Sequence, residues 1–378
     1  MKRLLLVGGG HAHLSVLDTL AREQPGGVEA VLVTPSRFQI YSGMLPGWMA
    51  GHYVQRECEI DLLPLAQLAR VRVVKDRVAG LDADRHRIHL EDGEPIEYDL
   101  LSLDVGSETD VAELQRAGDK LLPVKPLDAF FSAWPEIVSA ARHERGYRLV
   151  IVGGGAAGVE LALAAHYAFG RSGIDARIDL VVSDAGLLAG HARGVQRRIA
   201  RVLDSSGIVV HPLQAHGTEA GVILSDGTRL PADRIIAATG ARAPGWLKGS
   251  GLRLDRNAYV AVDGTYRSVS HPNVFAAGDV SARNDAVVGR SGVHAVHAGP
   301  VLGQNLLAVL RGGRMQTYQP RRHSLYLLAC GRRYAVASWG PWSAEGAWVW
   351  YWKDWIDRHF VQHFETASAR ATSGRRVS

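Results

Sequence analysis

The feature that most constrains the fold is a glycine-rich turn that directly follows a short apolar run. Leu149–Val152 is apolar throughout, as expected of a central parallel strand, and Gly153, Gly155 and Gly158 then form G-x-G-x-x-G. Side chains there would block the tight turn, the approach of a pyrophosphate to the backbone, or the packing of the next helix. A helix over Ala156–Phe169 would point its free N–H groups at the phosphates. The pattern predicts a Rossmann-like dinucleotide-binding unit.

A similar unit opens the chain. Leu4–Val7 is again apolar, and Gly8 and Gly10 occupy the first two positions of the glycine pattern. His13 occupies the third position, where Gly or Ala is usual. We therefore expect the first helix to sit slightly off its strand or to be arranged differently.

The two units repeat one layout beyond these turns. Gly93, in a hairpin signal, is followed 13 residues later by Gly106 at the end of a strand, and Gly227 and Gly240 stand in the same relation. We therefore predict an α/β fold with two Rossmann-like dinucleotide-binding domains, the second inserted in the first. The predicted bounds are residues 1–107 with 241–312 for the first domain, 108–240 for the second, and 313–378 for a C-terminal segment.

The C-terminal segment combines strands, a helix and a polar tail. We predict strands over Ser324–Ala329 and Tyr334–Trp339, an amphipathic helix over Ala347–Phe364, and disorder over Thr366–Ser378. The helix would have one apolar face, with its polar side chains mostly elsewhere: Trp348, Trp352, Trp355, Ile356 and Phe360, against Lys353, Asp354, Asp357, Arg358 and Gln362. Such a Trp-rich face could pack on the protein, join a homodimer, or make a peripheral membrane contact.

Composition excludes several classes of protein. The 378 residues suffice for two or three domains, and the net charge of +5 is spread over short Arg clusters, so nucleic acid is not an expected partner. Cys58 and Cys330 have no C-x-x-C or C-x4-C spacing, which excludes dithiol–disulfide exchange, and we interpret both as small core residues. We predict no metal site, no targeting signal and no apolar run of bilayer length, and cytoplasmic residence is the default expectation.

Three motifs together point to a family. VGGGHAH, GGGAAGVE and VFAAGD resemble the pyridine nucleotide–disulfide oxidoreductases, flavoproteins with two dinucleotide-binding domains. Without a redox disulfide, the chain is more similar to the type II NADH dehydrogenases and sulfide:quinone reductases. YSGMLPGWMAGHY, VKPLD, RYAVASWGPW and WKDWIDRHF are similar to NADH-dehydrogenase-like flavoproteins that in some organisms are fused to selenophosphate synthetase.

The resemblance implies FAD on the first unit. Gly8 and Gly10 would line the pyrophosphate, and Asp279 would accept hydrogen bonds from the ribityl chain. The helix near Val293–Ala298 would aim its N-terminus at the flavin pyrimidine, and Lys125 would approach the flavin unless it is an ordinary surface lysine. The other residues expected at this cofactor are His11, Ala12, Thr34, Tyr41, Pro46, Gly106 and Gly278.

The resemblance also implies NAD(P)H on the second unit. Its pyrophosphate would lie at Gly153, Gly155 and Gly158, and Glu160 matches an acidic residue near the nicotinamide. The alternative for Glu160 is a carboxylate favoured only by the helix dipole. Ala156 and Gly240 complete the expected contacts.

Both units depart from the family at the acidic residue that usually ends the second strand. In the first unit Thr34 stands there, so ribose recognition would use a hydroxyl or the backbone. In the second unit the position falls on Val182, and Asp184 comes two residues later. No Arg follows that strand immediately to take a 2′-phosphate, so NADH is mildly favoured over NADPH.

The expected activity is that of an FAD-dependent NAD(P)H:acceptor oxidoreductase. Hydride would pass from the nicotinamide to the flavin, and electrons would then pass to a small-molecule acceptor, with a quinone favoured. Two alternatives stay open: a sulfide- or selenium-handling flavoprotein, and a flavin-binding module with a degenerate NAD site.

Overall fold

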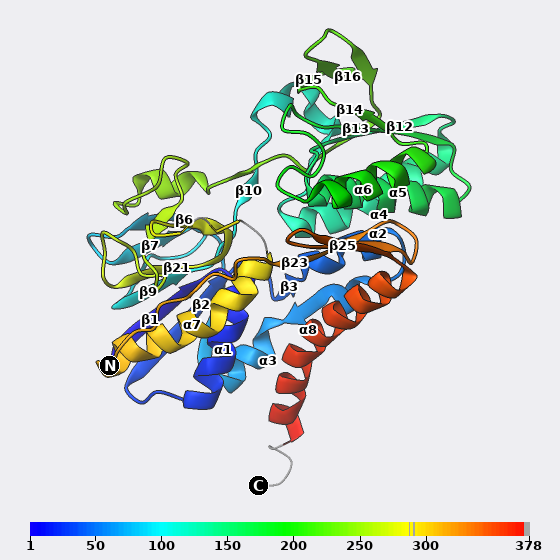
Figure 1. The fold of residues 1–378 in the computed structure, drawn as a ribbon. Helices are drawn as coiled ribbons and strands as arrows, with labels where there is room; N and C mark the ends of the chain where they lie inside the picture. Colours follow the sequence, from blue (N-terminus) through cyan, green and yellow to red (C-terminus); the bar gives the residue numbers. More distant parts are fainter. Residues whose placement is uncertain (287, 290–291, 374–378) are drawn as a thin grey trace.

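The structure, a computed structural model, describes residues 1–286, 288–289 and 292–373. Its first unit is a five-stranded parallel sheet with the order β21–β9–β1–β2–β5, and α1 and α7 lie side by side against it (Figure 1). The run Leu4–Val7 lies in the central strand and is buried on both faces, which explains its unbroken apolar sequence. The elements are β1 (Lys2–Val7), α1 (His11–Glu23), β2 (Val28–Thr34), α3 (Leu62–Leu68), β5 (Val71–Lys75), β9 (Leu100–Leu103), β21 (Val274–Ala276) and α7 (Gly292–Arg311).

The second unit is another five-stranded parallel sheet, with the order β11–β18–β12–β13–β14. Leu149–Val152 lies in its central strand, as the sequence predicts. The elements are β11 (Leu121–Pro123), α4 (Leu127–His143), β12 (Tyr147–Val152), α5 (Ala156–Arg171), β13 (Ala176–Val181), α6 (Arg193–Ser205), β14 (Val209–His211) and β18 (Arg234–Ala237).

Each unit also carries a three-stranded antiparallel sheet, which confirms that one plan is used twice. These sheets consist of β6 (Val78–Asp82), β7 (Arg87–Leu90) and β8 (Ile96–Glu97), and of β15 (Ala215–Thr218), β16 (Gly221–Leu224) and β17 (Arg229–Pro231). Because β21 and α7 return to the first sheet after the second is complete, the second unit is an insertion in the first. The chain crosses between the units at β10 (Glu108–Thr109) and β19 (Ala241–Arg242), which pair antiparallel.

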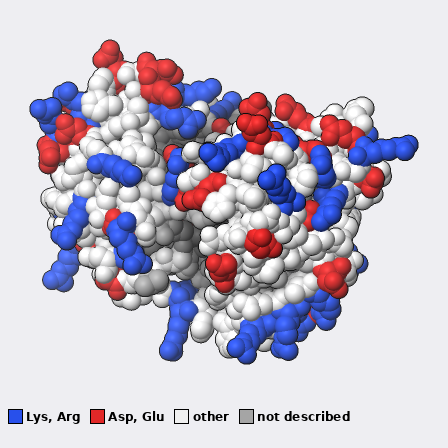
Figure 2. Space-filling model, turned by 90° about the horizontal axis from the view of Figure 1, so that it is seen from above, with Lys and Arg blue, Asp and Glu red and all other residues white. Residues whose placement is uncertain are grey.

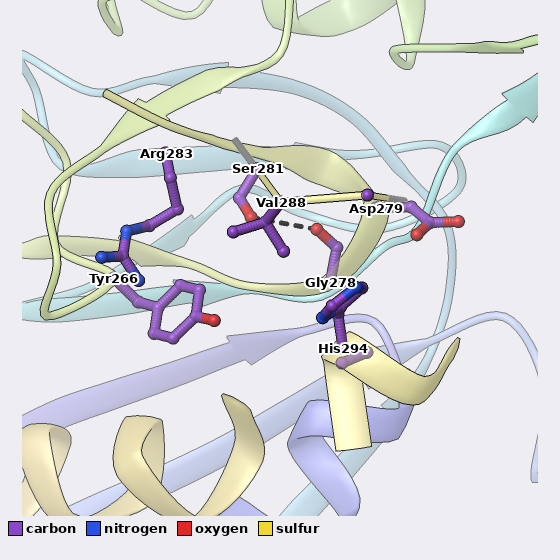
Figure 3. Close-up of a pocket in the computed structure, with 9 residues that line it drawn as sticks. Tyr266, Gly278, Asp279, Ser281, Arg283, Val288 and His294 are labelled. Carbon is purple, nitrogen blue, oxygen red and sulfur yellow. Dashed lines mark hydrogen bonds between the residues drawn. The ribbon is translucent and has the colours of Figure 1, made fainter. Parts of the chain in front are cut away.

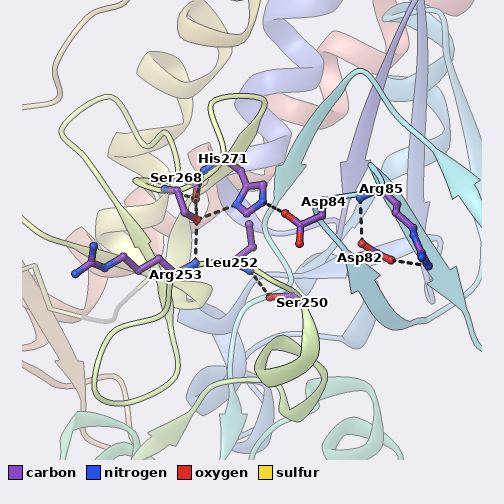
Figure 4. A network of polar contacts seen from close by, with 9 residues as sticks. Asp82, Asp84, Arg85, Ser250, Leu252, Arg253, Ser268 and His271 are labelled. Atoms are coloured by element: carbon purple, nitrogen blue, oxygen red, sulfur yellow. Dashed lines mark hydrogen bonds and ion pairs between the residues drawn. The ribbon is translucent and has the colours of Figure 1, made fainter.

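A polar network connects the turn after β6 with the segment that returns to the first unit (Figure 4). His271 Nε2 lies 3.2 Å from an Asp84 carboxylate oxygen, and its Nδ1 lies 2.9 Å from Ser270 Oγ. The Ser270 hydroxyl oxygen in turn accepts the Arg253 N–H at 2.9 Å. The network therefore holds the antiparallel sheet against the returning chain.

The C-terminal segment contacts both units. It forms an antiparallel sheet of β23 (Leu325–Ala329), β24 (Ala335–Trp339) and β25 (Trp342–Gly346), followed by α8 (Ala347–Ser373). The sheet packs on α6, where Glu345 pairs with Arg198 and Arg201, and α8 packs along α3 (Figure 1). This segment therefore bridges the two nucleotide-binding units.

Two helix predictions need correction. The sequence has a helical pattern over Arg290–Leu310 in which Gly299-Pro300 predicts an interruption. In the structure α7 runs through both residues, since its turns are buried against α1. Residue 290 lies outside the described residues. The expected disorder from Thr366 is wrong as far as Ser373, because α8 continues to that residue, and residues 374–378 lie outside the described part of the chain.

Charge is mixed on one face of the molecule, and one helix has the length and composition of a membrane span. Seen from above, the molecule is hollowed between two lobes, and Lys and Arg are interspersed with Asp and Glu on this face (Figure 2). Contrary to expectation, α7 is long and apolar enough to cross a bilayer by length and composition. Leu302 and Leu306 of α7 are fully buried, so packing in the core accounts for its apolar sequence.

Candidate functional site

The first glycine turn forms a cradle whose shape depends on missing side chains. Gly8 follows β1 with φ of +91°, a conformation that residues with side chains rarely adopt. A Cβ atom on Gly8 would overlap the main chain of Asp104, and one on Gly10 would overlap the Asp104 carboxylate. Because α1 starts directly after this turn, its dipole points at the cradle and favours an anion such as a pyrophosphate.

His13 replaces the third glycine and joins α1 to two strands by hydrogen bonds. Its ring is fully buried, with Nδ1 2.6 Å from the Gly8 carbonyl oxygen and Nε2 2.8 Å from Ser102 Oγ. A carbonyl can only accept, so Nδ1 carries the proton and Nε2 accepts from the Ser102 hydroxyl. Burial lowers the pKa of His13 to about 4, which keeps the ring neutral. The first helix is thus anchored through a side chain rather than by direct contact with the strand.

Sequence reasoning missed Asp104, which lies directly behind this cradle. It follows β9, is 3% exposed, and accepts the His13 N–H at 2.9 Å. Burial raises its pKa to about 7, hydrogen bonds from the N–H groups of His13 and Ala12 act in the opposite direction, and the charge of Asp279 raises it further. The available signal was a carboxylate at the end of an apolar strand, where the second unit has Ala238.

The structure brings Asp279 and Lys125 together from motifs far apart in the chain. Lys125 Nζ lies 2.7 Å from Asp279 Oδ2 and 3.0 Å from Ser107 Oγ. Asp279 lies in the short helix η5 (Gly278–Val280), directly after β21. The Lys125 side chain is only 36% exposed, and its charge fixes the carboxylate at the end of the first sheet. Lys125 is therefore part of this cluster rather than an isolated surface lysine.

A pocket adjoins Asp279 on the other side of η5. Figure 3 shows the Asp279 carboxylate pointing away from the other labelled side chains, while the Ser281 hydroxyl donates to the Gly278 carbonyl oxygen at 2.9 Å. Arg283 lies in the pocket wall, paired with Asp285 at 2.7 Å. The lining residues are Tyr266, Gly278, Asp279, Ser281, Arg283, Val288, Gly289, His294 and Ala295.

Tyr41 stands in a group of rings that joins the first unit to α8. Its ring stacks on Phe360 at 4.5 Å between centroids, and His11 meets Tyr41 edge-on at 5.5 Å. Burial lowers the pKa of His11 to about 4, and His11 Nε2 is buried without a hydrogen-bond partner among the described residues. A buried ring nitrogen of this kind fits a polar group of a bound flavin dinucleotide.

The start of α7 lies beside Tyr41, and the other predicted contacts are spread over both units. A Cβ on Gly292, at the start of α7, would lie 3.6 Å from Ser42 Oγ and 4.0 Å from His11. The helix α7 therefore starts beside the segment Tyr41–Gly43, which we call the Tyr41 loop. The remaining predicted residues are placed as follows: Pro46 is buried in α2 (Leu45–Met49), Val293 is in the first turn of α7, Gly106 follows β9, Ala156 begins α5, and Gly240 precedes β19.

The second glycine turn forms a more open cradle than the first. Gly153 has φ of +137°, and a Cβ on it would overlap the Ala238 carbonyl oxygen. A Cβ on Gly158 would overlap the carbonyl oxygen of Gly153, so α5 packs directly on the strand end. Around Gly155 a Cβ would meet nothing within 4 Å, which leaves this side of the backbone open to a pyrophosphate.

Glu160 faces the C-terminal segment rather than the N-terminus of its own helix. Its Oε1 accepts the N–H of Ala329, at the end of β23, at 2.8 Å. Burial raises the pKa of Glu160 to about 7, and the nearby charge of Lys353 partly offsets this. A carboxylate held only by the helix dipole would have a lowered pKa, so the dipole does not explain its position.

The buried face of α8 includes two polar residues, Lys353 and Asp357, that the sequence places off the predicted apolar face. Lys353 Nζ donates to the Gly43 carbonyl oxygen and to Asp357 Oδ2, both at 2.6 Å, and Asp357 also bonds the hydroxyl of Tyr41. The side chains of Lys353 and Asp357 are 11% and 5% exposed. A Lys–Asp pair four residues apart can be buried because each charge neutralises the other. The spacing of Lys353 and Asp357 was therefore a sequence signal for a buried ion pair.

Five large aromatic side chains of the C-terminal segment are exposed, and two of them, Trp348 and Trp355, belong to the predicted apolar face of α8. We call Trp339, Trp342, Trp348, Tyr351 and Trp355 the aromatic surface; each is at least 44% exposed. Trp348, Tyr351 and Trp355 follow one another at helical spacing on the outer side of α8. Large exposed aromatic groups are uncommon on a soluble surface, so these side chains are candidates for a contact.

The acidic positions of the two units are occupied differently from the family pattern. The Thr34 hydroxyl donates to the Ser36 carbonyl oxygen at 3.1 Å and is buried, so it serves the local turn. Val182 is buried against the glycine turn, since its side chain would overlap a Cβ on Gly154. Asp184 lies in the following turn, where its carboxylate accepts from Gln214 Nε2 at 3.1 Å.

The cysteines are buried. Cys58 is fully buried and Cys330 is 5% exposed, and neither forms a disulfide. Burial raises the pKa of both thiols to about 12, so the nucleophilic thiolate is scarce at neutral pH. This agrees with their interpretation as core residues.

Comparisons with known proteins agree with this geometry. A family model described as pyridine nucleotide-disulphide oxidoreductase matches residues 2–299. The ferredoxin–NAD(+) reductase component of the biphenyl dioxygenase system of Paraburkholderia xenovorans is 32% identical over 218 residues, 54% of this chain and 49% of that relative, so the chain spans about half its length. An NADH dehydrogenase-like protein of Mycobacterium tuberculosis is 27% identical over 307 residues, 75% of this chain and 73% of the relative. The solved sulfide:quinone oxidoreductase of Aquifex aeolicus has a TM-score of 0.81 over 97% of this chain and 92% of that chain, at 16% identity.

Proposed function

Because the chain belongs to the pyridine nucleotide-disulphide oxidoreductase family, whose members are FAD-dependent enzymes, we propose that it is an NADH:quinone oxidoreductase that works at a membrane surface. When bound, FAD supplies the chemistry of the reaction, accepting a hydride from NAD(P)H and passing electrons to the acceptor. The protein contributes two anion cradles, one on each unit. The Asp279–Lys125 pair would hold the ribityl chain, and the start of α7 would face the flavin ring.

The preference for NADH is supported by Asp184. A carboxylate near the adenosine ribose accepts hydrogen bonds from its hydroxyl groups and repels a 2′-phosphate. Gln214 holds this carboxylate at the end of the second unit's sheet, and among the residues that the structure describes no basic side chain forms an ion pair with it. We propose that Asp184 takes the role usually filled two positions earlier.

Proton handling supports a quinone as the acceptor. Reduction of a quinone consumes two protons, so the acceptor side needs a group that holds a proton near neutral pH. Glu160 has a pKa of about 7 and lies close to Lys353, which is bonded to Asp357 and through it to Tyr41. We propose that Glu160 Oε holds a proton for the acceptor and that Lys353 and Asp357 set its charge.

The orientation of α8 carries the proposal of membrane docking. One side of the helix places Lys353 and Asp357 against the Tyr41 loop, and the other side exposes Trp348, Tyr351 and Trp355 to solvent. Indole and phenol rings partition into the boundary between lipid headgroups and acyl chains, where a long-tailed quinone is found. A helix with these two sides can hold a lipid-borne acceptor next to the site. A homodimer contact is the other occupant of the aromatic surface that the sequence left open.

A half-reaction experiment tests the oxidoreductase part. NADH or NADPH is mixed anaerobically with the protein while flavin absorbance is followed, and quinone, sulfide or polysulfide is then offered. We expect NADH to bleach the flavin faster than NADPH, and quinone to restore its colour. Reduction of the flavin by sulfide but by neither nicotinamide would contradict the proposal and favour the chalcogen alternative. The buried, high-pKa thiols of Cys58 and Cys330 give that alternative no support.

A flotation experiment tests the membrane part. The triple variant Trp348→Ser, Tyr351→Ser, Trp355→Ser should lose binding to anionic liposomes and reduction of a long-tailed quinone, yet keep reduction of a short soluble quinone. The matched control is Val209→Ser, which changes an exposed apolar residue of the second unit. If the wild type does not float with liposomes and forms a dimer that the triple variant loses, the aromatic surface is a subunit contact.

A further inference from the structure

Asp104 lies at the back of the first cradle, where no general feature of a nucleotide-binding fold requires a carboxylate. Its Oδ2 accepts the His13 N–H at 2.9 Å, and the N–H of Ala12 also bonds the same carboxylate. A Cβ on Gly10 would overlap this carboxylate, and one on Gly278 would lie 2.6 Å from Oδ1. The carboxylate therefore fills the space behind Gly10 and Gly278, two glycines that are expected at the FAD site.

This position makes Asp104 an internal competitor of the cofactor. The first N–H groups of a helix are the groups that a phosphate anion uses, and two of those in α1 already bond Asp104. An ionised Asp104 would also repel a pyrophosphate held on the outer side of Gly10. A protonated Asp104 would keep its place without adding that repulsion.

The histidines near the cradle do not titrate together with Asp104. Burial lowers the pKa values of His11 and His13 in α1 and of His294 in α7, so they are neutral above about pH 6.5. The remaining charged groups that face this region are Asp279 of η5 and Lys125 before α4, which form an ion pair at 2.7 Å.

We propose that Asp104 couples FAD binding to proton uptake, so that the protein holds FAD more tightly when this carboxyl group is protonated. This inference rests on the first unit being the FAD site. Asp104 acts as a positioning residue, since it lies behind the glycines and acts on the cofactor through the cradle. The sign follows from linkage: a bound anion favours the protonated form, so affinity falls as pH rises through neutrality.

The test measures release of FAD from the holoenzyme. Holoenzyme is diluted at pH values from 6.0 to 8.5, and free FAD is measured by its fluorescence. The dissociation constant of the wild type should rise by roughly tenfold over this range, the equivalent of one pKa unit. Asp104→Asn, which keeps the shape and removes the ionisation, should hold FAD at every pH about as tightly as the wild type does at pH 6.0.

Two further variants make the outcomes distinct. Asp99→Asn changes a carboxylate at the opposite end of β9, where it bonds the Arg3 N–H, and should keep the wild-type slope. Asp104→Ala removes the carboxylate without adding atoms and should give the same flat profile, so either variant at Asp104 can be scored. A flat profile in the wild type, or equal slopes in the wild type and both Asp104 variants, would overturn the inference. A wild type that holds no FAD at any pH would instead overturn the proposed function.

Discussion

The two nucleotide-binding units share one plan but differ at three equivalent positions around the glycine turn. The first unit has His13, Ser102 and Asp104, a fully connected set of buried polar groups. The second unit has Gly158, Ile236 and Ala238, which pack by direct contact. The backbone therefore accepts either solution, provided that each buried polar group finds a partner.

The difference fits what each unit is proposed to hold. A permanently bound cofactor benefits from a cradle fixed by hydrogen bonds, since rigidity reduces the entropy lost on binding. A nucleotide that enters and leaves in every cycle needs only an open cradle and a helix N-terminus. We interpret the hydrogen bonds of His13 with Gly8 and Ser102 as a device that retains the cofactor, with Asp104 setting the pH dependence, and the glycine set of the second unit as a site for exchange.

Giving the second unit the histidine that the first unit has after its glycine turn should have the largest effect on activity. Gly158→His places a ring where a single Cβ would already overlap the Gly153 carbonyl oxygen, and Ile236 and Ala238 offer no polar partner. Displacement of the cradle by about 1 Å should slow flavin reduction by NADH on the order of 100-fold, while FAD stays bound. Stopped-flow absorbance measures both. Gly170→His, on the same helix in open space, is the matched control. A normal rate in Gly158→His would show that the close contact at this position is dispensable.

Replacing the histidine of the first unit by the glycine of the second should mainly lower the stability of the protein. His13→Gly leaves the Gly8 carbonyl and the Ser102 hydroxyl without their buried partner and opens a cavity beside the sheet. We expect the free energy of unfolding to fall by about 2–4 kcal/mol and FAD content to decrease. Urea unfolding and flavin absorbance check this. His166→Gly, at an exposed position of α5, measures the cost of a helical glycine alone. Equal losses of unfolding free energy in the two variants would show that the hydrogen bonds of the His13 ring do not contribute to stability.

Neutralising Glu160 of the second unit should affect turnover, whereas neutralising Asp104 of the first unit should affect the release of FAD. Glu160→Gln should leave FAD bound but slow turnover by about tenfold, since it removes one acid–base group. The folded-state pKa of Glu160 is about 7, above its ordinary value, so its protonated fraction falls as pH rises. The wild-type rate of quinone reduction should therefore decrease from pH 6 to pH 8, and the variant should lose this dependence. Unchanged rates in both half-reactions would restrict Glu160 to a structural role at Ala329.

The smallest effect is expected at the two thiols. Cys58→Ser with Cys330→Ser should keep NADH-to-quinone activity within about twofold, because buried thiols of raised pKa act as small apolar groups. Steady-state rates and FAD content are compared with the wild type. Activity at background with FAD still bound would point to sulfur chemistry and would favour the sulfide- or selenium-handling alternative.

Local sequence patterns were sufficient to predict the two units. An apolar run before a glycine turn places a strand and a helix start within a few residues, so β1, β12 and α5 could be found without knowing the tertiary structure. Contacts over long distances in the chain could not be found in this way. Lys125 and Asp279 are 154 residues apart, and no local period connects them.

The errors came from treating polar residues as exposed. Lys353 and Asp357 were placed off the predicted apolar face of α8, and charged side chains seldom lie inside a protein. Their mutual pairing removes most of that penalty, and Trp348 and Trp355 face outward. Asp104 escaped notice for the same reason, since its partners are main-chain N–H groups that have no signature in the sequence.

The hydrogen bond from Lys353 to the Gly43 carbonyl oxygen spans 310 positions of the chain. During synthesis, the Tyr41 loop is made long before the lysine that holds it. Both nucleotide-binding units can therefore form while the loop still lacks this contact. Docking of α8 is then the step that fixes the loop, and a chain that stops before Lys353 would have both cradles but a loop without its hydrogen bond to α8.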